Sequence, residues 1–295
     1  MGSSEVGQFG ITREQLVHAA DLLRAGKLVA FPTETVYGVG ANALNPTAVA
    51  RIYEAKGRPH SSPIIVHVSD FEMVRRVAAV WPDAARILAE RFWPGPLTLV
   101  LPKTPAVPDL VTAGLPTVGV RMPAHPGALA LIAVAQIPIA APSANRFTQV
   151  SPTTAEHVRR SLGDRVDFIL DGGPCQVGIE STVLSLAEPK PTLLRPGGVS
   201  RGQIESVIGP VADAREHHVG ESHASPGLHP RHYSPRTRLL LVENGEVPRQ
   251  GRGAYVQLAR PPQGEVAEII VMPGDAAEYA ACLYSILHAL DARYY

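Results

Sequence analysis

The chain has 295 residues, 45% of them hydrophobic, with 27 basic and 27 acidic side chains. This length predicts two domains rather than one, and the balanced charge excludes a global attraction to nucleic acid or to an anionic membrane. Two cysteines far apart in the sequence, Cys175 and Cys282, favour reduced thiols over a disulfide framework. The longest apolar stretch, residues 128–141, is too short to cross a bilayer, and no stretch is typical of a signal peptide. We therefore expect a cytoplasmic protein with no membrane partner.

The first elements are a capped helix and a buried strand. Thr12 to Gln15 form a capping box, an apolar face follows, and Gly26 ends the helix. The apolar run 27–31 predicts a short strand, which Pro32 terminates because proline lacks a ladder donor.

A polar stretch follows that strand. Thr33, Glu34 and Thr35 offer two hydroxyls and a carboxylate, and the glycines at 38 and 40 are expected to let a ligand approach the backbone. The pattern Gly38-x-Gly40-x-x-Ala43 imitates a dinucleotide fingerprint but lies six residues beyond its strand, so we do not predict a Rossmann cofactor site. The chain contains no P-loop motif.

Asn45-Pro46 predicts a helix start, and Gly57 predicts its left-handed stop near Lys56. Lys56 and Arg58 then lie two residues apart in a turn that we expect to be exposed, where they can form a phosphate clamp. The alternative is a solvated turn with no ligand.

The central segment alternates further strands and helices. Residues 61–68 predict a strand with His67 facing away from Ile64 and Val66, helices are expected after Asp70 and over 83–92, and a strand over 97–101. In the next strand, 117–123, alternation puts Thr117, Gly119 and Arg121 on one face. A strand arginine needs a partner, so we predict a substrate carboxylate or phosphate there, with a structural Arg–Asp/Glu pair as the alternative.

The following residues complete the first domain. We predict a helix over 125–135, a strand over 137–141 that leads to Ser143 and Asn145, and a helix beginning at Ser151-Pro152. Strands are expected over 166–170 and 180–186, Arg195 lies just past another strand, and Ser200 to Gln203 cap a last helix. This alternation indicates an α/β domain with polar residues gathered at strand ends, which suits a small anionic substrate beside a nucleoside triphosphate.

Residues 209–235 are rich in Gly, Pro, Ser and His and predict a linker. Its five histidines match no standard ligand spacing, so we predict no metal site in the protein. Strands are then expected over 237–242, 253–258 and 268–272, and an amphipathic helix over 275–293. These elements predict a small α/β domain, and since the sequence ends after one helix we expect a shortened one.

Ordered motifs identify a family resemblance. Residues 27–41 with Lys56-Gly-Arg-Pro59, Pro94–Thr98, Val120–Pro123, Ala141–Asn145, Glu180-Ser-Thr182 and Leu194–Gly197 resemble the YrdC/Sua5 family of threonylcarbamoyl-adenylate synthases. Residues 225–235 resemble the linker of the longer Sua5 type. The resemblance implies a mixed α/β sheet of the YrdC type over residues 11–208, a linker or lid over 209–235, and a Rossmann-like C-terminal domain over 236–295.

The resemblance also implies an activity and a site. Its members condense L-threonine, bicarbonate and ATP, with Mg²⁺, to threonylcarbamoyl-AMP and pyrophosphate, and a downstream transferase machinery uses the product for the t6A modification of tRNA. It implies that Thr35, His67, Arg121, Ala141 and Ser181 surround threonine. It implies that Arg58, Ser62, Thr117, Ser143, Ser151, Arg195 and Tyr233 surround ATP, with Lys56 and Asn145 nearby, and that Lys56, Arg58 and Arg121 serve catalysis. Tyr233 follows the first domain, so the linker is expected to fold back over the site as a lid.

Two other functions stay open at this stage. A concave sheet lined by Lys and Arg can hold RNA, although balanced charge and 5% aromatic residues disfavour this. A related carbamoyl transfer, as in larger hydrogenase-maturation and antibiotic O-carbamoylation proteins, is the second alternative, although the extra domains of those proteins are absent here.

Overall fold

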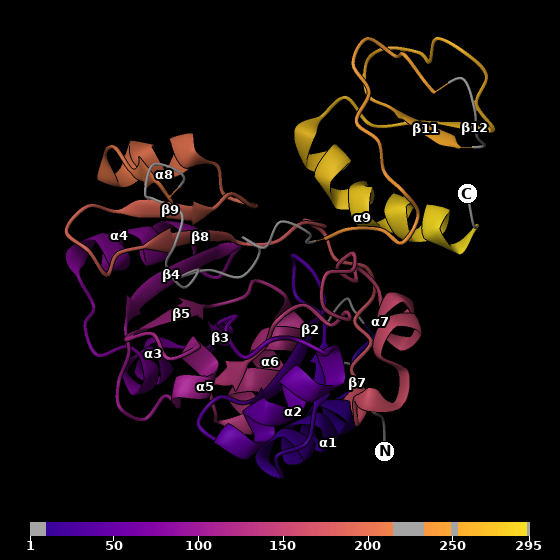
Figure 1. Ribbon diagram of the computed structural model, residues 1–295. Helices are drawn as coiled ribbons and strands as arrows, with labels where there is room; N and C mark the ends of the chain where they lie inside the picture. Colours follow the sequence, from indigo (N-terminus) through magenta and orange to yellow (C-terminus); the bar gives the residue numbers. More distant parts are fainter. Residues whose placement is uncertain (1–9, 215–232, 249–252, 294–295) are drawn as a thin grey trace.

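The computed structural model describes residues 10–214, 233–248 and 253–293, and Figure 1 draws its elements. A ten-stranded mixed sheet runs through the first of these ranges, in the order β10-β9-β8-β4-β5-β3-β6-β2-β1-β7. Its strands are β1 (Val29–Phe31), β2 (Gly38–Asn42), β3 (Val66–His67), β4 (Leu97–Pro102), β5 (Thr117–Arg121), β6 (Ile139–Ala140), β7 (Phe168–Ile169), β8 (Thr182–Ser185), β9 (Thr192–Arg195) and β10 (Ala212–Asp213). The expected mixed α/β sheet is confirmed.

Helices cover this sheet, and all of them except α5, which lies in a segment expected to be a loop, are near predicted positions. They are α1 (Arg13–Arg24), α2 (Pro46–Lys56), α3 (Phe71–Val77), α4 (Asp83–Phe92), α5 (Asp109–Thr112), α6 (Pro126–Ala135), α7 (Ala155–Leu162) and α8 (Arg201–Ile208), with a 3-10 turn at Gly163–Arg165. The capping box of Thr12 and Gln15 begins α1, and Gly57, at φ 62°, ends α2. Figure 1 shows α1, α2 and α6 near the end of the sheet that contains β2. It shows α4 and α8 near the end that contains β8 and β9.

The alternation predicted for β5 is present. Val118 and Val120 are buried in the apolar core, while Thr117 and Gly119 are partly exposed on the opposite face, which also carries Arg121. β5 pairs antiparallel with β4 and parallel with β3, so that Arg121 lies in register with His67. The topology therefore places two predicted ligand-binding side chains on neighbouring strands.

Residues 38–42 form β2, and Gly40 is needed for packing there because a Cβ would lie 2.7 Å from Ile139 and 2.8 Å from Phe31. Two local predictions are wrong. Ser151 does not begin a helix, since the N-cap of α7 is Thr154. Residues 237–242 form no strand. Their leucines at 239, 240 and 241 are exposed, so no described neighbour covers this apolar run.

β10 pairs parallel with β9, so two residues of the predicted linker belong to the large sheet. The C-terminal part contains the parallel strands β11 (Ala254–Gln257) and β12 (Glu268–Val271) and the helix α9 (Ala276–Ala292). α9 packs against the first domain through a second apolar cluster, whose buried members are Val36, Val150, Tyr284 and Leu287. In the part of the chain that the structure describes, no helix is both long and apolar enough to cross a membrane.

Candidate active site

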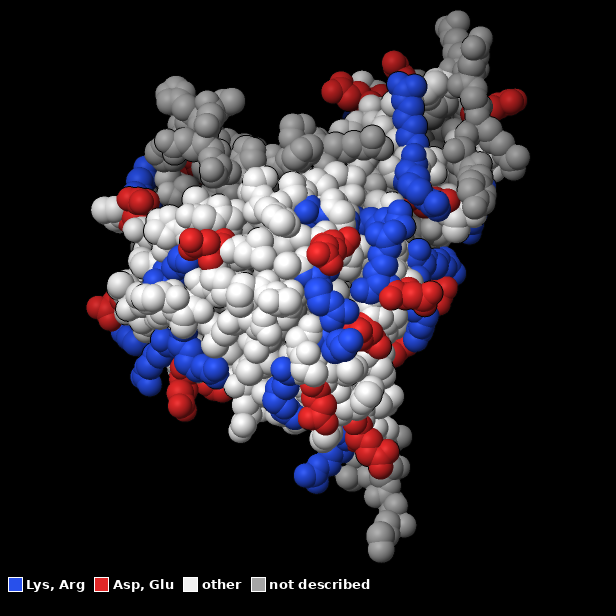
Figure 2. Space-filling view, turned by 60° about the horizontal axis from the view of Figure 1, so that its bottom comes forward, with Lys and Arg blue, Asp and Glu red and all other residues white. Residues whose placement is uncertain are grey.

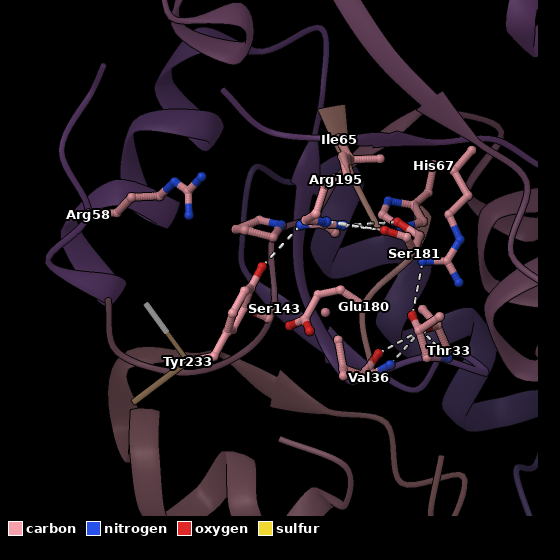
Figure 3. Close-up of a pocket in the computed structure, with 15 residues that line it drawn as sticks. Thr33, Val36, Arg58, Ile65, His67, Ser143, Glu180, Ser181, Arg195 and Tyr233 are labelled. Carbon is pink, nitrogen blue, oxygen red and sulfur yellow. Dashed lines mark hydrogen bonds between the residues drawn. The ribbon is translucent and has the colours of Figure 1, made fainter. Parts of the chain in front are cut away.

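A pocket opens at the strand ends near the middle of the sheet (Figure 3). It encloses about 530 Å³ of empty space, including the open solvent at its mouth. Its lining comprises Thr33, Thr35, Val36, Gly38, Arg58, Ile65, His67, Arg121, Ala141, Pro142, Ser143, Glu180, Ser181, Arg195 and Tyr233. Segments from residue 33 to residue 233 therefore converge on one cavity.

The turn after β1 orients the hydroxyl of Thr35. The Thr33 hydroxyl donates to the carbonyl of Val36 at 2.6 Å and lies 2.9 Å from the Thr35 hydroxyl. Arg121 Nη1 donates to Thr35 Oγ1 at 2.9 Å. Since the proton of Thr33 goes to Val36, the Thr35 hydroxyl must donate to Thr33 while it accepts from Arg121.

Arg121 is buried and held on three sides. Its Nε donates to the carbonyl of Gly95 at 3.1 Å, and its Nη2 lies 2.6 Å from Glu34 Oε1 in an ion pair whose angle is poor for a hydrogen bond. The other oxygen of Glu34 accepts from the backbone N–H of Ala124 at 2.9 Å. The structural Arg–Glu pair that the sequence left open is therefore present. Two of the five N–H donors of the guanidinium go to Gly95 and Thr35, and the other three, one on Nη1 and two on Nη2, make no hydrogen bond to the described residues.

His67 lies beside Arg121 and is 4% exposed. Burial, and secondly the charge of Arg121, lower the pKa of His67 to about 3. The ring is therefore neutral near pH 7 and offers one donor and one acceptor without adding charge to the pocket.

On the opposite side, Arg195 joins β9 to the start of β8. Its Nε and Nη2 donate to the carbonyl of Ser181 at 3.1 and 2.8 Å, and Nη2 also donates to Ser181 Oγ at 3.1 Å. Its Nη1 donates to the Tyr233 hydroxyl at 3.1 Å (Figure 3). Gly197 permits this arrangement, because a Cβ there would lie 2.4 Å from the carbonyl oxygen of Glu180.

Glu180 is a charged pocket residue whose role the sequence did not indicate. Among the described residues that line the cavity it is the only carboxylate. Its Oε1 accepts from the Ser151 hydroxyl, and its Oε2 accepts from the Tyr284 hydroxyl of α9 at 2.7 Å. The available signal was its place in the motif Glu180-Ser-Thr182, beside a residue that we had already predicted to bind substrate.

The predicted exposed clamp of Lys56 and Arg58 is wrong. Lys56 is the last residue of α2 and 3% exposed, and its ammonium donates to the carbonyls of Ser143 and Asn145, each at 2.5 Å. Burial lowers the pKa of Lys56 well below its usual value. Lys56 therefore fixes the loop that carries Ser143 into the pocket, and it does not line the pocket itself.

Arg58 is also buried, at 6% exposed, but its side chain does line the pocket. It donates to Ser62 Oγ at 2.5 Å and to the carbonyl of Pro63 at 2.9 Å, and it lies over the ring of Phe147 at 5.8 Å. Burial lowers the pKa of Arg58 to about 10, so its positive charge is retained near pH 7.

The pocket brings together nine of the fourteen predicted site residues, namely Thr35, Arg58, His67, Arg121, Ala141, Ser143, Ser181, Arg195 and Tyr233. Lys56, Ser62, Thr117, Asn145 and Ser151 are not in its lining. Ser62 binds Arg58, Asn145 donates to the carbonyls of Arg146 and Gln149, and Ser151 is fully buried. Thr117 lies at the other end of β5, on the same face as Arg121 but outside the pocket lining. Their predicted contacts with ATP stay predictions.

Tyr233 reaches the pocket from beyond the large domain. It has φ 53°, and the next residue, Ser234, donates its backbone N–H to Thr148 at 2.9 Å. The chain therefore returns to the site at Tyr233, as predicted. Residues 215–232 of the proposed lid, with its five histidines at 217, 218, 223, 229 and 232, lie outside the described residues.

Comparison with known proteins defines the class of this site. Residues 21–197 match the Sua5/YciO/YrdC family profile, whose description is telomere recombination, and residues 199–295 match the profile of the threonylcarbamoyl-AMP synthase C-terminal domain. The chain belongs to this family.

Individual relatives are similar to this chain in sequence and in structure. The chain is 53% identical over 231 residues to threonylcarbamoyl-AMP synthase of Bacillus subtilis, covering 78% of this chain and 67% of that protein. It is 52% identical over 227 residues to the enzyme of that name from Pyrococcus abyssi, covering 76% and 67%. The crystal structure of P. abyssi Sua5 complexed with L-threonine superposes with a TM-score of 0.87 at 42% identity, over 95% of this chain and 86% of that one.

Proposed function

We propose that this protein is an L-threonylcarbamoyladenylate synthase, a nucleotidyltransferase that condenses L-threonine, bicarbonate and ATP. The observation that carries the proposal is the convergence of Arg121, Thr35 and His67 with Arg58 and Arg195 in one pocket. Relatives at 52–53% identity bear this enzyme name, and a similar structure was solved with L-threonine. The product would pass to the machinery that transfers the threonylcarbamoyl group to tRNA for t6A.

We assign threonine to the half of the pocket around Arg121. Arg121 keeps N–H groups that make no hydrogen bond to the described residues and can bind a carboxylate, and a buried Arg–carboxylate contact is strong and directional. His67, Thr35, Ser181 and the backbone of Ala141 complete this half of the pocket. A neutral His67 leaves the amino group of threonine free of cationic repulsion from the imidazole, which suits its reaction with bicarbonate.

We assign ATP to the half around Arg58, Ser143, Arg195 and Tyr233. Loss of water from threonine and bicarbonate gives a carbamate, and one of its oxygens attacks the α-phosphorus of ATP as pyrophosphate leaves. This in-line displacement needs positioning and charge neutralisation but no protein nucleophile. Arg58 and Arg195 can supply the positive charge, and β5 from Arg121 back to Thr117 offers a partly exposed face for the remainder of the nucleotide.

Mg²⁺ fits this site as a companion of ATP rather than as a resident ion. The described residues include no cluster of three or more His, Cys, Asp or Glu side chains that could hold a metal, and both oxygens of Glu180 already accept hydroxyl groups. The phosphates would hold the ion, which retains waters and supplies neutralisation of phosphate charge.

The RNA-binding alternative has less support. Figure 2 shows basic and acidic side chains interspersed on the face that carries α1 and α2, with no broad area of one sign. Such mixing gives weak attraction to a polyanion. Carbamoyl transfer stays a second enzyme hypothesis, because it would use the same anion-binding residues.

The test is pyrophosphate release with ATP, threonine and bicarbonate omitted in turn. We expect release only when all three are present, with threonylcarbamoyl-AMP as the product. Release that does not depend on threonine, or turnover with carbamoyl phosphate in place of bicarbonate, would contradict the proposal. Salt-dependent RNA affinity without any turnover would favour the binding function.

A further inference from the structure

α9 contacts the pocket residue Glu180 and the segment before α7, although it follows them by more than 100 positions. The hydroxyl of Tyr284 donates to Glu180 at 2.7 Å, and the hydroxyls of Ser285 and Thr153 lie 2.9 Å apart. His288 Nε2 lies 3.0 Å from the carbonyl oxygen of Ser151. Tyr284 is 7% exposed, so its contact with Glu180 is shielded from water.

The backbone that carries Glu180 is shaped to receive this helix. Gly178 has φ 72°, and a Cβ there would lie 2.6 Å from the carbonyl oxygens of Ala280 and Ala281. A side chain at this position would collide with the backbone of α9 as well as strain the turn. The close packing of α9 therefore depends on Gly178, in the segment immediately before Glu180.

Both oxygens of Glu180 are held by hydroxyl donors from different parts of the chain. Ser151 belongs to the segment before α7, and Tyr284 belongs to α9. Two donors fix the carboxylate plane, whereas one donor leaves it free to rotate about its last bond. Tyr284 thus decides how the only described pocket carboxylate faces the cavity.

Tyr284 also supports the aromatic wall of the pocket. Its ring stacks on Tyr233 with centroids 6.2 Å apart and an angle of 28° between the rings, and Tyr233 accepts a hydrogen bond from Arg195. Arg121, in contrast, has its contacts with Thr35, Glu34 and Gly95, which lie in other segments. The contacts of α9 with the pocket therefore lie on the side of Arg195, not on the side of Arg121.

We propose that Tyr284 and Glu180 form a positioning pair through which the C-terminal helix sets the affinity of the nucleotide half of the site. This inference rests on the proposed assignment of ATP to that half. Tyr284 does not touch the pocket space itself. It acts by holding Glu180 and Tyr233, and Glu180 in turn faces the ligand.

The main test is Tyr284→Phe, which removes one hydroxyl and keeps the ring that stacks on Tyr233. A hydrogen bond to a charged group corresponds to roughly a tenfold effect or more. We expect KM for ATP, and the Kd of a nonhydrolysable ATP analogue measured by calorimetry, to rise about five- to tenfold. KM for threonine should stay within about twofold. The matched control is Tyr279→Phe, the same change on a partly exposed tyrosine of α9 that lies outside the pocket.

A second variant tests the pair as a unit. Glu180→Gln keeps the size of the side chain but removes its charge. The double variant with Tyr284→Phe should bind the analogue as well as the single variant that has the lower affinity. Additive losses would contradict the coupling. A lower Tm for Tyr284→Phe with unchanged analogue affinity would show that α9 only stabilises the fold.

The two proposals fail in different ways. If the wild-type protein releases no pyrophosphate with all three substrates, the proposed function fails, whatever the variants do. If the wild type is active and Tyr284→Phe matches Tyr279→Phe in analogue affinity and in KM for ATP, the positioning role of Tyr284 is overturned.

Discussion

A buried glutamate lies in or beside each half of the pocket, Glu34 behind Arg121 and Glu180 in the lining, but the two are held in different ways. Glu34 pairs with a cation, Arg121, and accepts from the backbone of Ala124. Glu180 accepts two hydrogen bonds, from the hydroxyls of Ser151 and Tyr284. The Glu34 half is built within the large sheet and its adjoining loops. The Glu180 half depends on the last helix of the chain.

Because of this difference, substitutions in the two halves should lower the free energy of unfolding by different amounts. Removing one member of a buried ion pair leaves an uncompensated charge, at a cost of about 3–5 kcal/mol. Removing one hydroxyl from a carboxylate that keeps a second donor costs less, about 1–3 kcal/mol. We therefore expect substitutions in the Glu34 half to affect both folding and threonine binding, and those in the Glu180 half to act mainly on the nucleotide.

Arg121→Ala should have the largest effect. It leaves Glu34 buried without its cation, and we expect the free energy of unfolding to fall by about 3–5 kcal/mol and threonine-dependent turnover to be lost. ATP binding should persist in the protein that remains folded. Urea unfolding and threonine calorimetry measure the two effects. Arg86→Ala, which breaks an exposed pair with Glu90, is the control and should leave the free energy of unfolding nearly unchanged. Unchanged threonine affinity would reduce Arg121 to a purely structural partner of Glu34.

Lys56→Ala should be the next most disruptive change, and it tests the revised role of this residue. The substitution removes the donor for the buried carbonyls of Ser143 and Asn145, so we expect a loss of about 2–4 kcal/mol. Lys190→Ala, in an exposed turn, should leave the unfolding free energy nearly unchanged. Weaker ATP binding with full stability would instead support the phosphate clamp that the sequence suggested.

His67, in the threonine half, makes the free energy of unfolding depend on pH. Because burial lowers its folded pKa to about 3, the unfolded chain takes up the proton first as the pH falls below about 6.5. Its contribution to stability is therefore complete above pH 6.5 and lost progressively toward pH 3. This amounts to about 2 kcal/mol between pH 6.5 and pH 5. His67→Asn should flatten the stability profile in that window, whereas His60→Asn, at an exposed position, should not. Equal slopes for the two variants would contradict this prediction.

The sequence predicted most elements because their signals are local. The capping box at Thr12, the Asn45-Pro46 start with its Gly57 stop, and the alternation around Arg121 all reappear in the structure. Each depends on contacts within a few residues, which propensity and periodicity describe directly. The family resemblance added the identity of residues that share the pocket.

The errors arose where a distant segment decided the outcome. Lys56 turns inward because carbonyls 87 and 89 residues later accept its protons, and no local pattern shows this. Ser151 is followed by proline, as at many helix starts, yet its hydroxyl goes to Glu180 and the helix starts later at Thr154. Glu180 itself was missed because one of its two partners, Tyr284, lies in the last helix.

Tyr233→Phe should have the smallest effect and gives the sharpest separation of the two halves. The change removes the hydroxyl that accepts from Arg195 Nη1, while Arg195 keeps its bonds to Ser181 and the ring keeps its stack on Tyr284. A single hydrogen bond is worth about 0.5–1.5 kcal/mol, so we expect KM for ATP to rise about two- to tenfold. KM for threonine should not move, because Arg121 is held by Glu34 and Thr35 rather than by the aromatic wall. Tyr255→Phe removes the same atom from an exposed contact with Arg260 and should change neither constant. A parallel rise of both constants in Tyr233→Phe would mean that Arg195 and Ser181 transmit the change across the pocket, and the two halves would then have to be treated as one unit.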